Sequence, residues 1–418
     1  MAVDTLKVRD AADVEAVVRA AIAGEQPLEI IGHGSKRLIG QPMATNAVLD
    51  LSSLNKVTSY EPNELIITVE AGAPLSDVMS LIDSKNQQFA FEPVDTAALL
   101  GGPALGTIGG MIGAGLAGPR RIKAGGVRDH LLGAHAVSGF GDSFKTGGRV
   151  VKNVTGYDLC KLLAGSFGTL AVMTEVTLKV MPRPESERTL VLRGLDDLTA
   201  NRAMTIALGS PFDVSGAAHL PASALRTDVG GLDQLGEPRA AVTLLRLEGT
   251  EVSAAHRAAA LARMLDKALE AFGTAPVLED AASVSVWSSV RDARPFAASG
   301  SLGAWPVWRI VCPPAAGGAL GQALARDTGG DVIYDWGGGL IWAALPPKPD
   351  AQAALVRQRV EATGGHATLL RASEQVRRQV DVFHPQAKGL AALGERVRLS
   401  FDPKGILNRG RLRRGEAA

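Results

Sequence analysis

The first 180 positions alternate between apolar and polar residues in short blocks whose period changes several times. Apolar residues recur at i, i+3, i+4 and i+7 across residues 10–23, which predicts an amphipathic helix. Short apolar, β-branched runs at residues 28–31, 48–51 and 65–70 predict strands. Residues 74–86 are amphipathic again and begin with a proline, which favours the first turn of a helix. Helices alternating with strands indicate an α+β or α/β domain.

The pattern changes after a long predicted strand at residues 169–180. Pro182 and Pro184 lie there among charged residues and predict a domain boundary. Residues 185–380 are rich in Ala, Leu, Arg and Asp, and two rounds of strand, helix and strand are predicted. The predicted strands are 240–247, 307–311, 331–334 and 339–345, and the predicted helices are 253–272 and 351–361. We expect an open sheet with helices on one face.

Glycine is concentrated between Gly101 and Pro184: residues 101–170 hold 18 of the 48 glycines of the chain. Glycine tolerates positive φ and lets a ligand approach the backbone closely, and several converging N–H groups bind phosphate oxygens. A flexible linker is the simplest alternative, but linkers are rich in serine and other polar residues. Apolar residues such as Ile108 and Leu116 instead lie between these glycines. We therefore expect a packed, ligand-binding stretch.

A second glycine loop follows the predicted strand at residues 28–31. A strand that leads into a tight loop, here residues 32–36, is a usual way to hold a pyrophosphate. Two familiar phosphate motifs fail. The dinucleotide fingerprint needs a glycine where Arg37 stands, and a P-loop at residues 139–146 needs a glycine where Phe144 stands.

Composition excludes several classes of function. The formal net charge of +1 and an aromatic fraction of 4% argue against a nucleic-acid surface. Cys160 and Cys312 lie too far apart for an iron–sulfur cluster or a cysteine-rich zinc site within this chain. Residues 96–119 carry no charge, but eight glycines and two prolines make them a poor membrane helix. The N-terminus has no apolar signal region. We expect a cytoplasmic protein without a transmembrane segment.

Several phrases in the chain resemble one flavoprotein superfamily. IGHGSK (31–36), GTIGGMIGAGLAGPRR (106–121), GGVRDHLLG (125–133), the run 152–184 and FDPKGILNRG (401–410) resemble the FAD-binding oxidoreductases of the vanillyl-alcohol oxidase / p-cresol methylhydroxylase (PCMH) type. Further phrases resemble the FAD-binding subunit of glycolate oxidase (glycolate dehydrogenase), the GlcE type. These are LLRLEG (244–249), VWRIVCPP (307–314), YDWGGGLIWA (334–343) and GGHATLLRA (364–372).

The resemblance implies an α+β fold in three parts. A two-subdomain PCMH-type FAD-binding domain would occupy residues 1–183, and an inserted α+β cap domain residues 184–380. The cap would be an antiparallel sheet with helices on one face, and residues 381–418 would return to the FAD-binding domain. The implied cofactor is FAD. Its implied binding residues are Ile31, Gly32, His33, Gly34, Ser35, Lys36, Gly106, Thr107, Ile108, Gly109, Gly110, Gly113, Gly115, Val172 and Asn408.

Two positions depart from the family pattern: His33 stands where glycine is usual, and Arg409 where proline is usual. His33 lies between two glycines rather than after them, so we expect a surface histidine beside a phosphate rather than a covalent link to the flavin. Polar residues that could lie near the flavin are Arg120, Arg121, Lys123, Arg128, Asp129, Lys152, Asn153, Tyr157 and Asp158; each could equally be a surface charge or a cap.

No catalytic residue is evident from the sequence. Stand-alone D-2-hydroxyacid dehydrogenases of the superfamily carry clustered metal-binding histidines in the cap, whereas His219, His256, His366 and His384 have no metal-ligand spacing. We therefore predict no metal. Trp305, Trp308, Trp336 and Trp342 could anchor a partner, but we expect them in the core of the cap.

The resemblance leaves three hypotheses for function. In the first, this chain is the FAD-binding subunit of a glycolate oxidase complex and relays electrons from 2-hydroxy acid (glycolate) oxidation in a catalytic FAD subunit toward an iron–sulfur subunit. Such a chain is cytoplasmic, or peripheral at the inner membrane through its complex. In the second, it is a stand-alone FAD-dependent D-2-hydroxyacid dehydrogenase. In the third, it binds its partners without turnover.

Overall fold

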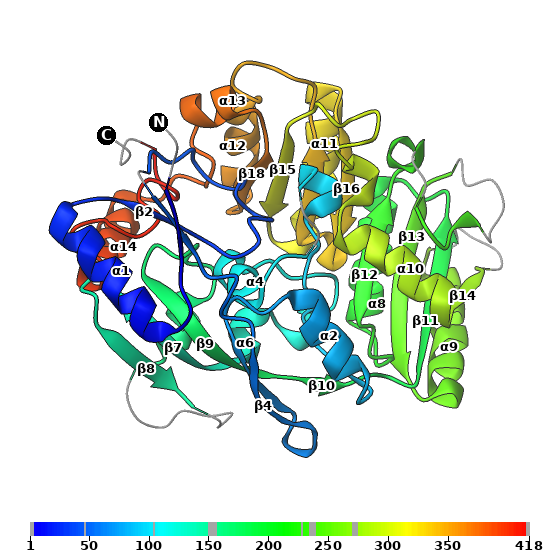
Figure 1. The fold of residues 1–418 in the computed structure, drawn as a ribbon. Helices are drawn as coiled ribbons and strands as arrows, with labels where there is room; N and C mark the ends of the chain where they lie inside the picture. Colours follow the sequence, from blue (N-terminus) through cyan, green and yellow to red (C-terminus); the bar gives the residue numbers. More distant parts are fainter. Residues whose placement is uncertain are drawn as a thin grey trace.

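The computed structural model describes residues 4–45, 47–102, 105–148, 157–226, 229–233, 240–269 and 275–414 (Figure 1). The N-terminal part begins with a small parallel sheet of β1 (Asp4–Lys7), β3 (Ala47–Asp50) and β2 (Leu28–Ile31), in the order β1-β3-β2. Helix α1 (Ala11–Gly24) packs on this sheet through Val14, Val18 and Ala21. Asp10 caps α1 by accepting a hydrogen bond from the N–H of Asp13.

A five-stranded antiparallel sheet forms the second layer of the N-terminal part. Its order is β4 (Val57–Glu61), β5 (Ile66–Glu70), β9 (Ala171–Lys179), β7 (Leu131–Ser138) and β8 (Ser143–Gly147). One face of this five-stranded sheet packs on short helices that connect the strands. These helices are α2 (Leu75–Asp83), α4 (Ile108–Ala114), α6 (Val127–His130) and α7 (Cys160–Leu163). The remaining short elements are α3 (Ala97–Leu100), α5 (Arg121–Ala124), the 3-10 helix η1 (Pro62–Glu64) and the pair β6 (Gln87–Gln88) with β10 (Met181–Pro182).

An eight-stranded antiparallel sheet, here called the large sheet, extends from the upper middle of Figure 1 to its right side. The large sheet has two halves, and each half is built from the same series of elements: strand, helix, strand, strand, helix, strand. The two halves meet where β12 pairs with β16. The first half consists of β11 (Ser186–Arg193), α8 (Asp197–Leu208), β12 (Gly216–Leu220), β13 (Val242–Gly249), α9 (Glu251–Leu269) and β14 (Val277–Glu279). The second half consists of β15 (Val307–Val311), α11 (Gly317–Thr328), β16 (Asp331–Asp335), β17 (Leu340–Ala344), α12 (Ala353–Glu361) and β18 (His366–Arg371).

The strand order β14-β11-β13-β12-β16-β17-β15-β18 makes each half a split βαβ unit, with its first strand between its third and fourth. One face of the large sheet packs on α8, α9, α11 and α12 in a single apolar cluster. The other face, here called the inner face, carries α10 (Asp280–Arg291) and contacts the N-terminal part through residues such as Val94, Leu100 and Leu116. The described residues of this part also form the 3-10 helices η2 (Ala222–Arg226), η4 (Arg294–Phe296), η5 (Pro314–Ala316) and η6 (Trp336–Gly338).

The C-terminal segment runs back to the first sheet. After α13 (Glu374–Gln379) and α14 (Lys388–Phe401), Leu407 bridges to Leu28 of β2, and the Lys404 ammonium donates to the carbonyl of Ile22 in α1. Figure 1 shows this red segment beside the blue α1. None of the helices in the described part of the chain is long and apolar enough to cross a membrane.

Most predicted elements are present. The helix at 10–23 and the strands at 28–31 and 307–311 are confirmed with nearly the predicted bounds, as is the mixed fold with antiparallel sheets. The prediction lacks α14, although Leu390, Leu393 and Val397 recur at helical spacing. Val397 packs against the apolar cluster of the five-stranded sheet. The end of the helix predicted at 253–272 lies outside the described residues.

Five charged side chains that are buried or nearly so join the N-terminal part to the large sheet. The Arg246 guanidinium, fully buried on β13, donates to the Glu92 carboxylate at 2.8 and 3.1 Å. The Arg120 guanidinium bonds Glu92, Glu187 and Glu248. Two guanidiniums therefore face three carboxylates. Burial, with the Glu248 charge adding to it, raises the pKa of Glu187.

We expect Arg246→Met to destabilise the protein by about 3–5 kcal/mol, because it leaves buried carboxylates with too few cations. Without Arg246 the folded-state pKa values of these carboxylates rise above their unfolded values, so the loss should be larger at pH 8 than at pH 5. Denaturant unfolding at both pH values measures this. Arg326→Met, which removes an exposed cation, is the control; equal losses for the two variants would contradict a stabilising role for the cluster.

Candidate cofactor-binding site

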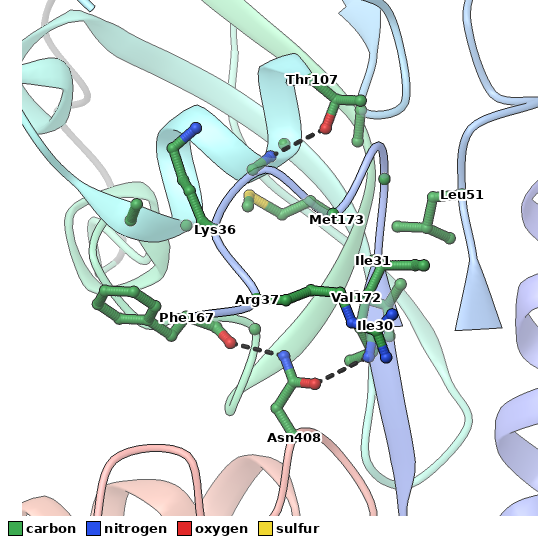
Figure 2. Close-up of a pocket in the computed structure, with 18 of the residues that line it drawn as sticks. Ile30, Ile31, Lys36, Arg37, Leu51, Thr107, Phe167, Val172, Met173 and Asn408 are labelled. Carbon is green, nitrogen blue, oxygen red and sulfur yellow. Dashed lines mark hydrogen bonds between the residues drawn. The ribbon is translucent and has the colours of Figure 1, made fainter. Parts of the chain in front are cut away.

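A cleft in the N-terminal part, with about 750 Å³ of empty space, brings the two glycine-rich segments together. Its walls are the loop after β2, the first turns of α4, the turn before β9 and the C-terminal segment (Figure 2). Twelve of the fifteen residues assigned to the cofactor line it: Ile31, Gly32, His33, Gly34, Ser35, Lys36, Thr107, Gly109, Gly110, Gly113, Val172 and Asn408.

The loop of residues 32–36 presents a row of unpaired backbone donors. Within the described part of the chain, none of its five N–H groups has a protein acceptor at hydrogen-bond distance. The positive φ in this loop is at Gly34 (+71°), not at His33, which is exposed. Buried or half-buried N–H groups need acceptors, and successive N–H groups of this kind form anion-binding concavities.

Two glycines let the loop and α4 approach each other. A Cβ at Gly32 would lie 2.4 Å from the Thr107 hydroxyl, and a Cβ at Gly106, whose φ is +84°, would lie 2.2 Å from the Ser35 hydroxyl. Any side chain at either position would push the walls apart. Gly106 thus shapes the cleft from just outside it.

The start of α4 contributes a surface rather than free donors. The N–H groups of Ile108 and Gly109 donate to the carbonyls of Ala73 and Ala71, and Thr107 caps the helix by accepting from the N–H of Gly110. A Cβ at Gly109 would meet Ala71 at 2.9 Å, so this glycine is needed for packing whether or not a ligand is present. The side chain of Ile108 is buried in the core, and Gly115 ends α4 with a φ of +64°.

Lys36 places a buried ammonium in the cleft. Its Nζ donates to the Ser35 hydroxyl and to the carbonyl of Leu105, both at 3.1 Å. Burial lowers the pKa of Lys36 to about 8, against a small opposing effect of the Asp95 carboxylate. A cation held without a close carboxylate stabilises a negatively charged ligand.

Asn408 fixes the relative position of two walls. Its amide oxygen accepts from the N–H of Ile30 at 2.8 Å, and its amide nitrogen donates to the carbonyl of Phe167 at 2.7 Å (Figure 2). Asn408 has a φ of +45°, which asparagine tolerates better than most residues. Asn408 therefore acts as a brace between β2 and the turn before β9.

Sequence reasoning missed Arg411, three residues after Asn408. Its guanidinium is buried in the cleft wall, donates to the carbonyl of Lys36 and lies 5.8 Å from the centre of the Phe167 ring. Its Nε is buried without a hydrogen-bond partner among the described residues, and burial lowers the pKa of Arg411 to about 10. Arg409, which departs from the family pattern, is exposed.

The polar candidates do not gather around this cleft. Arg120 belongs to the buried charge cluster, Lys123 pairs with Asp213, and Asp129 caps α6 by accepting from the N–H of Gly126. Tyr157, Asp158 and Arg128 are exposed, with Tyr157 92% exposed. Arg121 lies over Trp336 of the large sheet. Lys152 and Asn153 lie outside the described residues.

The cap histidines are spread over both faces of the large sheet. His219 is fully buried beneath α8, with its ring nitrogens facing Thr243 and Asp197, and His256 lies on α9. His384 faces the N–H of Ala367. Among the described residues, no group of three or more His, Cys, Asp or Glu side chains could hold a metal ion. Trp308, Trp336 and Trp342 are buried in the core of the sheet, and Trp305 is partly buried.

The cleft fits a dinucleotide with a negatively charged diphosphate: it offers free N–H donors, a buried ammonium and walls that closely spaced glycines bring together. The family of FAD binding domains matches residues 5–147. The chain is 31% identical to the glycolate oxidase subunit GlcE of Escherichia coli (strain K12) over 403 residues, which cover 94% of this chain and 95% of the relative. The chain belongs to the GlcE family of glycolate oxidase subunits. It binds FAD and is an FAD-linked oxidoreductase.

Other relatives match over shorter stretches or in fold alone. The glycolate oxidase subunit GlcD of Bacillus subtilis (strain 168) is 34% identical over 173 residues, 41% of this chain and 35% of the relative. Among solved structures, p-cresol methylhydroxylase has a TM-score of 0.71 at 15% identity and covers 97% of this chain and 88% of its own. The 4-ethylphenol oxidase from Gulosibacter chungangensis has a TM-score of 0.69 at 16% identity and covers 99% and 90%. These two share the fold.

We expect FAD affinity to fall as pH rises above about 8, because a diphosphate beside Lys36 raises the pKa of its ammonium on binding. Lys36 contributes fully to FAD affinity below pH 8. This contribution is lost as the pH rises toward the higher pKa that Lys36 has in the FAD complex. Lys36→Met should weaken binding about 10- to 100-fold at pH 7 and abolish this pH dependence. Flavin fluorescence titrations from pH 6.5 to 9.5 measure both. Lys404→Met, which removes an exposed ammonium, is the control; a pH profile that Lys36→Met leaves unchanged would contradict this assignment.

Proposed function

We propose that this chain is the FAD-carrying subunit of a multi-subunit glycolate oxidase complex. In this complex it relays electrons from 2-hydroxy acid oxidation in a second FAD subunit toward an iron–sulfur subunit. The observation that carries the proposal is the likeness to E. coli GlcE over 94% of the chain, against 41% for the B. subtilis subunit GlcD. Bound FAD supplies the redox chemistry, and the protein positions it and excludes water.

We further propose that residues 1–183 with residues 381–418 form the FAD-binding domain and residues 184–380 the cap. The loop 32–36 would donate its N–H groups to the FAD diphosphate, and Lys36 would neutralise part of its charge. Thr107, Gly109, Gly110, Gly113 and Val172 would line the cofactor, and Asn408 would hold the walls at the correct separation. The five unpaired N–H groups support this assignment because a diphosphate offers them acceptors.

The positions of His219 and His256 also support a relay role, whereas His366 lies on the inner face with Arg121 and Arg309. His219 and His256 lie on the face of the large sheet that α8 and α9 cover, away from the N-terminal part. His219 is engaged by Asp197 and Thr243, so its ring stabilises the fold. The alternative, a stand-alone D-2-hydroxyacid dehydrogenase, needs a group beside the flavin that takes the substrate proton.

We expect the purified, flavin-loaded chain to keep its visible absorption when glycolate is added without oxygen, and to lose it when the two partner subunits are also present. Anaerobic spectrophotometry with glycolate and D-lactate measures this. Rapid bleaching of the chain alone would contradict the relay role and favour the stand-alone dehydrogenase. A colourless chain that does not take up FAD would leave a purely structural role.

A further inference from the structure

Two arginines from the two parts of the molecule meet on one tryptophan. The Arg121 guanidinium carbon, from α5, lies 4.5 Å from the centre of the Trp336 ring, and that of Arg309, from β15, lies 5.0 Å from the same centre. Arg309 also lies 5.9 Å from the Trp342 ring. These contacts leave the N–H donors at the edge of each guanidinium available, because a stacked cation uses its face.

The strand pattern places Arg309 on the inner face of the large sheet. Its neighbours Trp308 and Ile310 pack toward the helices on the other face, and side chains alternate along a strand. In the sheet Arg309 lies between Trp342 and Thr368. The Trp336 indole N–H donates to the carbonyl of Gly118 at 3.0 Å and ties this face to the segment after α4.

Neither guanidinium has an anionic partner. Among the described residues, no carboxylate lies within 4.0 Å of Arg121 or Arg309, and neither donates a hydrogen bond to the protein. Burial and then the Arg121 charge lower the pKa of Arg309 to about 10. Arg309 is partly exposed and Arg121 is exposed. Two like charges beside each other favour a bound anion.

The neighbouring titratable groups do not supply that anion. Asp335 accepts from the N–H of Trp336 at 2.7 Å, and burial raises its pKa to about 7, so much of it is protonated near neutral pH. Burial and the charges of Arg309, His384 and Arg121 lower the pKa of His366, so its imidazole is neutral at pH 7.

The apolar cluster that contains Trp336 extends to the wall of the cofactor cleft. Ala114 lines the cleft and belongs to the same apolar cluster as Trp336 and Leu340, and Phe167, another lining residue, packs against that cluster. We propose that Arg121 and Arg309 together bind a small carboxylate, of the 2-hydroxy or 2-oxo acid class, between the N-terminal part and the large sheet. The class of anion rests on the proposed function; the site itself rests on the two unpaired guanidiniums.

The chemistry favours a carboxylate because a guanidinium matches its two oxygens with two parallel hydrogen bonds. Arg121 and Arg309 would each contribute one side of the site, so the anion would bind only when the two parts of the molecule are correctly joined. Binding alone is proposed here, and no proton or electron is moved. A carboxylate at this site would be a substrate, product or regulator held close to the cofactor.

The test is calorimetric titration of the flavin-loaded protein with oxalate, a dicarboxylate with no hydrogen on carbon to be removed, at pH 7 and low salt. We expect Arg309→Gln to weaken oxalate binding about 10- to 100-fold and to leave the bound flavin unchanged. Arg121→Gln should weaken it as well, and Arg309→Lys should retain part of the affinity because it keeps the charge but loses the paired donors. Arg326→Gln, an exposed arginine on the other face of the large sheet, should behave as the wild type.

Several results would overturn the proposal. The first is that oxalate does not bind to the wild type, and the second is that Arg309→Gln binds oxalate with unchanged affinity. The third is that Arg309→Gln loses its flavin but keeps its oxalate affinity, which would assign the guanidiniums to the cofactor. Inorganic phosphate that binds more tightly than oxalate would exclude the carboxylate class. The titration does not depend on turnover: oxalate binding without electron relay in the complex would refute the proposed function and leave the site.

Discussion

The unpaired N–H groups of residues 32–36 are the constraint on which the account of the site depends. Five successive donors without acceptors among the described residues are costly in a half-buried loop, and an anionic ligand is the simplest way to satisfy them. Gly32 and Gly106 allow the loop to approach α4, and Gly34 supplies the positive φ that turns the chain. With these donors in place, Lys36 needs only to add one positive charge.

The rest of the fold holds that loop in position. Asn408 bonds both Ile30 and the carbonyl of Phe167, so the C-terminal segment closes the cleft that the first thirty residues begin. On the opposite side, Arg120 and Arg246 bind the carboxylates that join the N-terminal part to the large sheet. The inner face of that sheet then brings Arg309 to Arg121. Cofactor and anion sites thus depend on contacts between segments far apart in sequence.

Much of this arrangement could be predicted from the sequence, because periodicity and glycine both reflect local constraints. The strand at 28–31, its glycine loop and helix α1 follow from spacing alone. Interactions over long sequence separations could not be predicted. Nothing in the local pattern reveals that Arg411 returns to the cleft, that the amides of Ile108 and Gly109 are already bonded, or that Arg120 is buried among carboxylates.

Amide hydrogen exchange of residues 32–36, with and without FAD, tests the central claim most directly. Exchange reports whether each N–H has an acceptor, independently of turnover and of partner subunits. We expect these five amides to exchange rapidly in the FAD-free protein and at least about tenfold more slowly once FAD is bound. The amides of α14, residues 388–401, should not change. Unchanged exchange at residues 32–36 on FAD binding would contradict the account.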